Sequence, residues 1–193
     1  MVTHLEGLLS QAESESLDFK CQFHSNNVEL LHDIICLANS YVAEDKYLVF
    51  GVKDDKTVVG VQSDSNRKKN ADIQDLLRQS NFNRIPTVNL KTIKYQTNEI
   101  DILIIRNRPD KPFFLMKDKS SKDKILRAGV IYTRLGDTNI PLKESASEAQ
   151  IELMWRERFR LDLPPLDRMM LLLDDSEAWI SINDDTQLYH KQF

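Results

Sequence analysis

Residues 47–61 read YLVFGVKDDKTVVGV, and the predicted sheet is built around them. Two runs rich in β-branched and aromatic residues flank the polar turn KDDK, a pattern that predicts a β-hairpin. The first run is apolar at nearly every position, so we expect its strand to be covered on both faces. The turn then places Asp54 and Asp55 at the rim of a buried strand. An ordinary solvated turn, in which Asp is favoured, remains the alternative.

Further β patterns and one strong helix pattern extend this hairpin into a mixed sheet. Residues 28–43 carry apolar side chains at helical spacing after a capping residue, Asn26, and we expect this helix to pack on the sheet. Asp33 lies off the apolar stripe and is expected to be exposed. A second hairpin is predicted from residues 87–95 and 99–107, and a polar loop over residues 117–124. The predicted strands of the sheet are residues 16–23, 47–53, 57–61, 99–107 and 129–135.

The fold class that follows is α+β: a mixed β-sheet built from hairpins with packed helices, plus a helical C-terminal appendage. We divide the chain into a domain of residues 1–145 and a mainly helical appendage of residues 146–193. Helical patterns at residues 145–161 and 166–173 support the second part. Because the composition turns acidic there and the sequence ends on an apolar residue, we expect the natural chain to continue, and the appendage could begin a further domain.

The composition is that of a globular protein, with 193 residues of which 41% are hydrophobic and 29% charged. No apolar run approaches the roughly 20 residues that span a bilayer, so we expect no membrane partner. The first residues are too acidic for a signal peptide. Cys21 and Cys36 alone provide no disulfide framework, which predicts a cytoplasmic protein.

The net charge of −4 is distributed unevenly along the chain. Residues 1–61 and 144–193 each have a net charge of −6, whereas residues 62–143, with 17 basic and 9 acidic side chains, have a net charge of +8. A basic middle segment is typical of nucleic-acid binding, although a solvated face with internal ion pairs would have the same composition. The candidate nucleic-acid-binding residues are Arg67, Lys68, Lys69, Arg127 and Arg134.

One group of acidic residues suggests chemistry. Glu13, Asp18 and Asp54 meet if the strand of Asp18 lies beside the strand that ends near Asp54, and Lys20 shares a face with Asp18. Three carboxylates at one rim repel one another unless a cation neutralises them, and oxygen ligands suit Mg²⁺ or Mn²⁺. The lysine would then offset charge that develops during phosphodiester hydrolysis.

Five motifs, taken in order, resemble one known family. ESESLDFK (13–20), ANS (38–40), FGVKDD (50–55), VVGV (58–61) and GVIYTRLG (129–136) resemble the Schlafen-like AlbA domain, also called the AlbA-type DNA-binding domain. The resemblance covers about residues 10–145. It implies a mixed α/β domain that occurs in nucleic-acid-associated proteins.

The resemblance also implies roles for the acidic residues. In Schlafen nucleases an acidic triad cleaves RNA, and its positions match Glu13, Asp18 and Asp54. This chain departs from the pattern in two places: Asp18 replaces the usual Glu, which shortens its reach by one methylene, and residues 42–47 replace the usual Gly-Gly. Many bacterial members are not shown to be enzymes, so membership alone does not establish catalysis.

Two functional hypotheses follow. The first is a nucleic-acid-binding domain, for RNA or DNA, with a divalent-metal-dependent site for RNA phosphodiester hydrolysis, whose catalytic residues are Glu13, Asp18, Asp54 and Lys20. The alternative is a non-catalytic binding or assembly module of a longer regulatory or defence protein, in which a homodimer interface covers the same acids. The four histidines show no metal-ligand spacing, and no glycine-rich phosphate loop is present.

Overall fold

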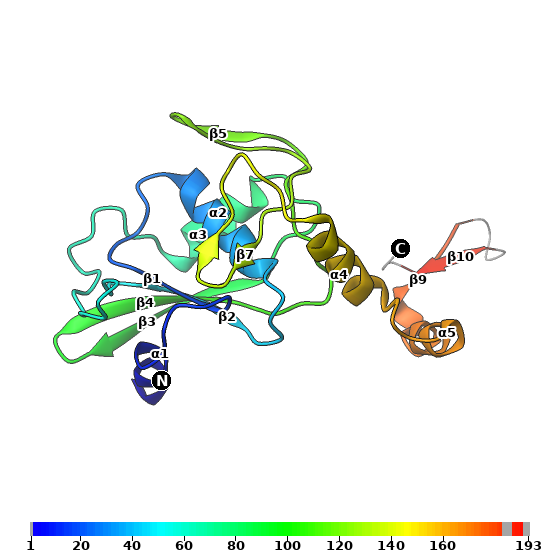
Figure 1. The fold of residues 1–193 in the computed structure, drawn as a ribbon, viewed down its shortest axis with the longest axis horizontal. Coiled ribbons are helices and arrows are strands. Elements are labelled where there is room, and N and C mark those ends of the chain that lie inside the picture. Colours follow the sequence, from blue (N-terminus) through cyan, green and yellow to red (C-terminus); the bar gives the residue numbers. More distant parts are fainter. Residues whose placement is uncertain (1, 183–186, 191–193) are drawn as a thin grey trace.

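A four-stranded sheet forms the centre of the computed structural model, which describes residues 2–182 and 187–190 (Figure 1). Its strand order is β1-β2-β4-β3. The strands comprise β1 (Leu17–Lys20), β2 (Lys46–Phe50), β3 (Val88–Tyr95) and β4 (Asn98–Ile105). The chain is therefore an α+β fold with a mixed sheet, as its sequence predicts.

The connection between β1 and β2 sets the position of the later site. β1 pairs with β2 in parallel, Asp18 opposite Leu48 and Lys20 opposite Phe50, whereas β4 runs antiparallel to both β2 and β3. Parallel neighbours need a crossover, and α2 (Asn27–Ala38) supplies it. In the strand order of the sheet, β1 lies at one edge.

Helices cover both faces of the sheet, and α1 (Val2–Leu9) lies on the face opposite α2 and α3 (Asn70–Arg78) (Figure 1). On the α2 side the core includes Leu48, Phe50, Leu103 and Ile105. On the α1 side it includes Leu17, Phe19, Val49 and Ile102. Strands β2 and β4 thus alternate between two cores, which is why they read as continuous apolar runs.

Helix α2 is buried on nearly all sides rather than along one stripe. Asn26 caps it by accepting a hydrogen bond from the Val28 N–H at 2.9 Å. Nine of its twelve residues are buried, among them Leu30, Ile34 and Leu37. Each buried Leu, Ile or Val side chain of α2 stabilises the fold by about 1.5–3 kcal/mol relative to an exposed position. The segments 111–115 and 130–142 cover the side of α2 that faces away from the sheet.

One predicted strand does not form, and a second forms only at its end. Residues 57–61 make an isolated bridge, Val52 to Val58, because they cross over Gly51 instead of lying beside β2. Gly51 has a φ of +94°, and a Cβ there would lie 3.0 Å from the Gly60 backbone, so the crossing requires glycine. Of residues 129–135, only Arg134–Leu135 form a strand, β7, paired with β8 (Thr138–Asn139).

The predicted polar loop at residues 117–124 is wrong, because the chain forms a hairpin there. β5 (Lys119–Ser121) and β6 (Lys124–Leu126) pair antiparallel around a turn in which Lys122 has a positive φ of 54°. The hairpin has almost no apolar residues to mark it as strand in the sequence. Figure 1 shows it extending beyond the body of the domain.

The C-terminal part is mainly helical, in agreement with the prediction. Ser147 caps α4 (Glu148–Phe159), and α5 (Pro165–Leu173) follows a short turn. A 3₁₀ turn and a small hairpin come after α5: η1 (Ser176–Ala178), β9 (Trp179–Ser181) and β10 (Leu188–His190). The helices of the described chain are all too short or too polar to cross a membrane.

Candidate functional site

Asp18 and Lys20 form the start of a polar network on β1. Their neighbours Leu17 and Phe19 point to the α1 side of the sheet, so the alternation of the strand directs Asp18 and Lys20 toward α2. Asp18 is buried, and the Lys20 ammonium lies 2.7 Å from its Oδ2 as an ion pair. The predicted grouping of these two residues is therefore present.

Arg134 holds the other oxygen of Asp18 from strand β7. Its Nη2 donates to Asp18 Oδ1 at 3.2 Å, Nε donates to the Ser14 carbonyl at 2.8 Å, and Nη1 donates to Asn139 Oδ1 at 2.9 Å. The Arg134 side chain is only 1% exposed. Arg134 is thus an internal cation, and its predicted role in contacting nucleic acid is wrong because phosphate cannot reach it.

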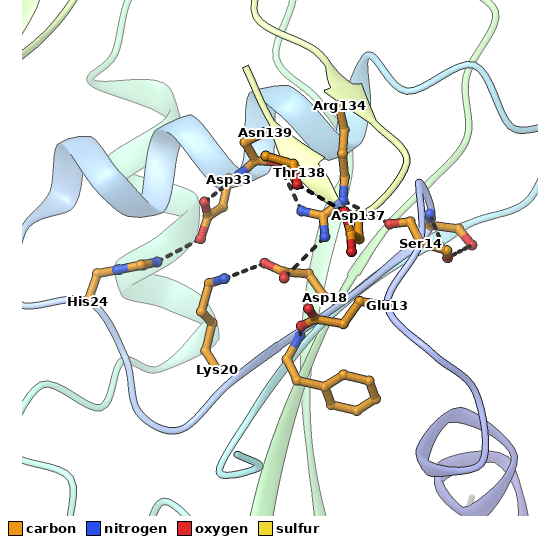
Figure 2. Close-up of polar contacts among 12 residues, drawn as sticks. Glu13, Ser14, Asp18, Lys20, His24, Asp33, Arg134, Asp137, Thr138 and Asn139 are labelled. Carbon is orange, nitrogen blue, oxygen red and sulfur yellow. Dashed lines mark hydrogen bonds and ion pairs between the residues drawn. The ribbon is translucent and has the colours of Figure 1, made fainter. Parts of the chain in front are cut away.

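The network continues through residues that the sequence did not indicate (Figure 2). Asn139 donates to Asp33 Oδ1 at 2.8 Å, and the His24 Nε2 lies 2.6 Å from Asp33 Oδ2. Asp33 is buried, contrary to the expected exposure, because the β7–β8 loop covers that side of α2. A signal was available in retrospect: an acid inside a helix with few other polar residues.

The carboxylates of Asp18 and Asp33 together determine the direction in which the pKa of Lys20 shifts. Burial alone would lower the pKa of Lys20, but the charges of Asp33 and Asp18 outweigh this effect and raise it. Burial works to raise the pKa of Asp33, whereas its hydrogen bond to His24 and the nearby cations lower it. The group is therefore a compensated set of charges, each stabilised by its neighbours.

Glu13 lies beside this network without joining it by a hydrogen bond to another side chain. Its Oε1 accepts from the Phe19 N–H at 2.8 Å, which satisfies a backbone donor of the edge strand β1. Its charge also acts on Lys20 and raises the pKa of that lysine. Glu13, Asp18 and Lys20 are thus neighbours, as predicted.

Asp54 lies apart from the other two acids. It is exposed on the turn after β2 and lines a surface hollow with Cys21, Lys53 and Asp55. The register explains the separation, because Asp18 is opposite Leu48, six residues before Asp54. Across the described residues no three His, Cys, Asp or Glu side chains are arranged to hold a metal ion. The predicted metal site of Glu13, Asp18 and Asp54 is therefore not assembled.

The remaining basic candidates differ in whether their charge is neutralised by an ion pair within the protein. Arg67 donates to Asp101 and Glu99 at 2.7 and 2.6 Å, so its charge is largely used within the protein. Arg127 pairs with Asp118 at 3.1 Å but is 59% exposed. Lys68 and Lys69 line a hollow with Arg67 at the start of α3, and Lys69 is exposed.

Comparison with known proteins identifies the family. Residues 13–143, which are 131 of the 193 residues, match the family described as Schlafen, AlbA_2. The chain belongs to this family. It is accordingly a nucleic-acid-related domain, and the matched region contains the sheet, α2 and the whole polar network. No curated protein matches the chain.

Solved structures that are similar to this Schlafen, AlbA_2 chain include the following two. The crystal structure of the DIP2311 protein from Corynebacterium diphtheriae is 17% identical, with a TM-score of 0.40, over 80% of this chain and 28% of that one. The N-terminal domain of a protein from Nitrosomonas europaea, described as related to the ATP-dependent DNA helicase RecG, is 17% identical with a TM-score of 0.37. That match covers 53% of this chain and 70% of the domain. The chain thus spans little more than a quarter of the Corynebacterium protein.

The divalent metal that the Schlafen resemblance implies does not fit the residues as they are arranged. Asp18 already has a cation at each oxygen, Arg134 at Oδ1 and Lys20 at Oδ2. A metal ion would have to displace Lys20 and would remain beside the buried charge of Arg134. Asp54, the third predicted ligand, is not part of this group.

Proposed function

We propose that the chain is a nucleic-acid-binding domain that recognises phosphates of the backbone. The supporting observation is that the segment with a net charge of +8, residues 62–143, lies entirely within the region that matches the Schlafen, AlbA_2 family. Lysines in that segment face solvent, including Lys69 beside α3. Phosphate contacts of this kind provide affinity without sequence specificity.

The direct test is binding of labelled nucleic acid as a function of salt. Single and double strands of RNA and of DNA are titrated with the protein, and fluorescence anisotropy gives each affinity. For a duplex, each phosphate contact contributes about −0.9 to the slope of log affinity against log salt, so three contacts predict about a 40-fold loss between about 50 and 200 mM salt. Absence of binding, or binding that salt does not weaken, would contradict the proposal.

We do not extend the proposal to phosphodiester cleavage, because Asp54 is separate from Glu13 and Asp18 and because two cations already hold Asp18. Incubation of labelled RNA and DNA with Mg²⁺, Mn²⁺ or EDTA tests this limit. We expect the nucleic acid to remain intact in all three. Cleavage in Mn²⁺ that EDTA stops, and that is lost in Asp54→Asn, would restore the hypothesis of a metal-dependent nuclease.

A further inference from the structure

The β5–β6 hairpin, which we call the basic arm and define as residues 117–127, combines a projecting shape with an excess of positive charge. Figure 1 shows it reaching past the body of the domain above α2. Its sequence, KDKSSKDKILR, contains five basic and two acidic residues, a net charge of +3.

The arm is attached to the domain rather than free to move independently. Leu126 is buried in the α2 core, and Asn26 donates from its side chain to the Ser121 carbonyl at 3.2 Å. Lys124 forms an ion pair with Glu29 of α2. A surface held in place in this way loses less conformational entropy on binding than a flexible loop would.

Three lysine side chains of the arm have no partner among the residues that the structure describes. The ammonium groups of Lys117, Lys119 and Lys122 form no hydrogen bond or ion pair there, and Lys117 and Lys122 are exposed. Elsewhere in the protein, basic side chains often form internal ion pairs: Arg134 pairs with Asp18, and Arg67 pairs with Asp101. The arm therefore offers positive charge that is still available to a ligand.

We propose that the basic arm contacts the phosphodiester backbone of double-stranded nucleic acid through Lys117, Lys119 and Lys122. This inference rests on the proposed function and names the surface that performs it. The arm has no aromatic side chain on which an unpaired base could stack, and such stacking contributes to single-strand binding. Lysines bind phosphate as point charges, so the contact is independent of sequence.

The test compares two variants with equal loss of charge. The first replaces the three arm lysines with glutamine: Lys117→Gln, Lys119→Gln and Lys122→Gln. The control replaces three exposed lysines outside the arm, none of which has a side-chain partner among the described residues: Lys53→Gln, Lys91→Gln and Lys94→Gln. Both sets are titrated against DNA and RNA duplexes and the matching single strands across the same salt range. Circular dichroism confirms that each variant is folded.

We expect the arm variant to bind duplex at least tenfold more weakly at low salt, with a salt slope reduced by about 2.7, which is three lost contacts. The control should retain the affinity and slope of the parent, and arginine at the three arm positions should preserve binding. If the parent binds duplex and the arm variant binds equally well, the inference is wrong and the proposed function stands. If the parent binds single strands more tightly than duplex, the duplex assignment is wrong. Failure of the parent to bind any nucleic acid overturns both.

Discussion

Arg134 and Asp18 form an ion pair in which both side chains are nearly inaccessible, at 1% and 4% exposure. A buried pair differs from a surface pair because each charge has lost its hydration and depends on the other. Removal of Arg134 leaves the buried Asp18 carboxylate with Lys20 as its remaining ion-pair partner. Removal of Asp18 leaves the buried Arg134 guanidinium with its neutral hydrogen-bond partners Ser14 and Asn139. Arg127 and Asp118 form a chemically identical pair at the surface, where water replaces a lost partner. The two pairs are therefore a matched comparison within one chain.

We predict that Arg134→Met lowers the free energy of unfolding by about 3–5 kcal/mol, whereas Arg127→Met lowers it by less than about 1 kcal/mol. Urea denaturation followed by circular dichroism measures both. Asp18→Asn combined with Arg134→Met should cost less than the sum of the two single changes, because both changes remove the same ion pair and its loss is counted only once. Equal and small losses for the two arginine variants would show that the Arg134 pair is solvated.

The sequence predicts some of these residue positions and not others, for a physical reason. The period of two along a strand correctly places Asp18 and Lys20 on one face. It cannot identify Arg134, which is 116 residues from Asp18 and reaches it only through the tertiary fold. Helical periodicity likewise assigns Asp33 to the exposed side of α2, because periodicity does not include the loop that brings Asn139 over it.

At the scale of elements, Asn39 joins the end of α2 to two segments that would otherwise have no partner strand. Its side-chain amide donates to the carbonyls of Phe113 and Tyr132, both at 2.8 Å, and its Oδ1 accepts from the Phe113 N–H at 2.8 Å. Thr133 donates to the Asn39 carbonyl at 3.1 Å. Individual partners of this kind replace a regular strand ladder, which explains why residues 129–135 pattern as β and yet form little strand.

We predict that Asn39→Ala lowers the free energy of unfolding by at least about 3 kcal/mol, since it leaves three buried backbone groups without hydrogen bonds. Asn39→Asp should be about as harmful, because a carboxylate cannot donate to the two carbonyls. Asn83 is the control: it bonds to the Pro112 carbonyl and the Phe114 N–H in the same manner but is half-buried. Chemical denaturation of Asn39→Ala and Asn83→Ala should show the larger loss at Asn39, and the reverse order would contradict this account.

Elements with a strong local signal are predicted well. The β3–β4 hairpin and α4 lie close to their predicted positions because strand alternation and helical spacing act over a few residues. The spatial arrangement of the elements is harder to predict from the sequence. β2 pairs with β1 and β4, not with residues 57–61. The close contact of Gly51 with Gly60 lets residues 57–61 cross over the end of β2 instead of pairing along it. The candidate site depends on that arrangement, and the position of Asp54 was mispredicted with it.

For the whole molecule, the main question is where the folded domain ends. Helix α4 lies beyond the family match but packs on it, since Met154 is buried against Ile131 and Ala146. The buried Lys111 ammonium also lies 3.3 Å from Glu157 of α4. After α4 the contacts change, because α5 exposes Leu166, Met170 and Leu173 and its apolar groove is shared only with the end of α4. From these contacts we expect the stable unit to end after α4.

We therefore predict that a chain of residues 1–163 is as stable as the full chain to within about 1 kcal/mol, whereas a chain of residues 1–145 is less stable by about 2–5 kcal/mol. The loss of stability comes from removing the buried Met154 side chain, and it is comparable to that of a large-to-small core substitution. The lost Glu157 contributes little, since removing α4 also returns Lys111 to water, which compensates its charge. Amide hydrogen exchange of peptides from β2 and β4 is the suitable measurement, because it reports the opening of the sheet alone. Equal protection of these strands in all three chains would place the boundary at residue 145, and loss of protection in the 1–163 chain would show that the sheet depends on α5.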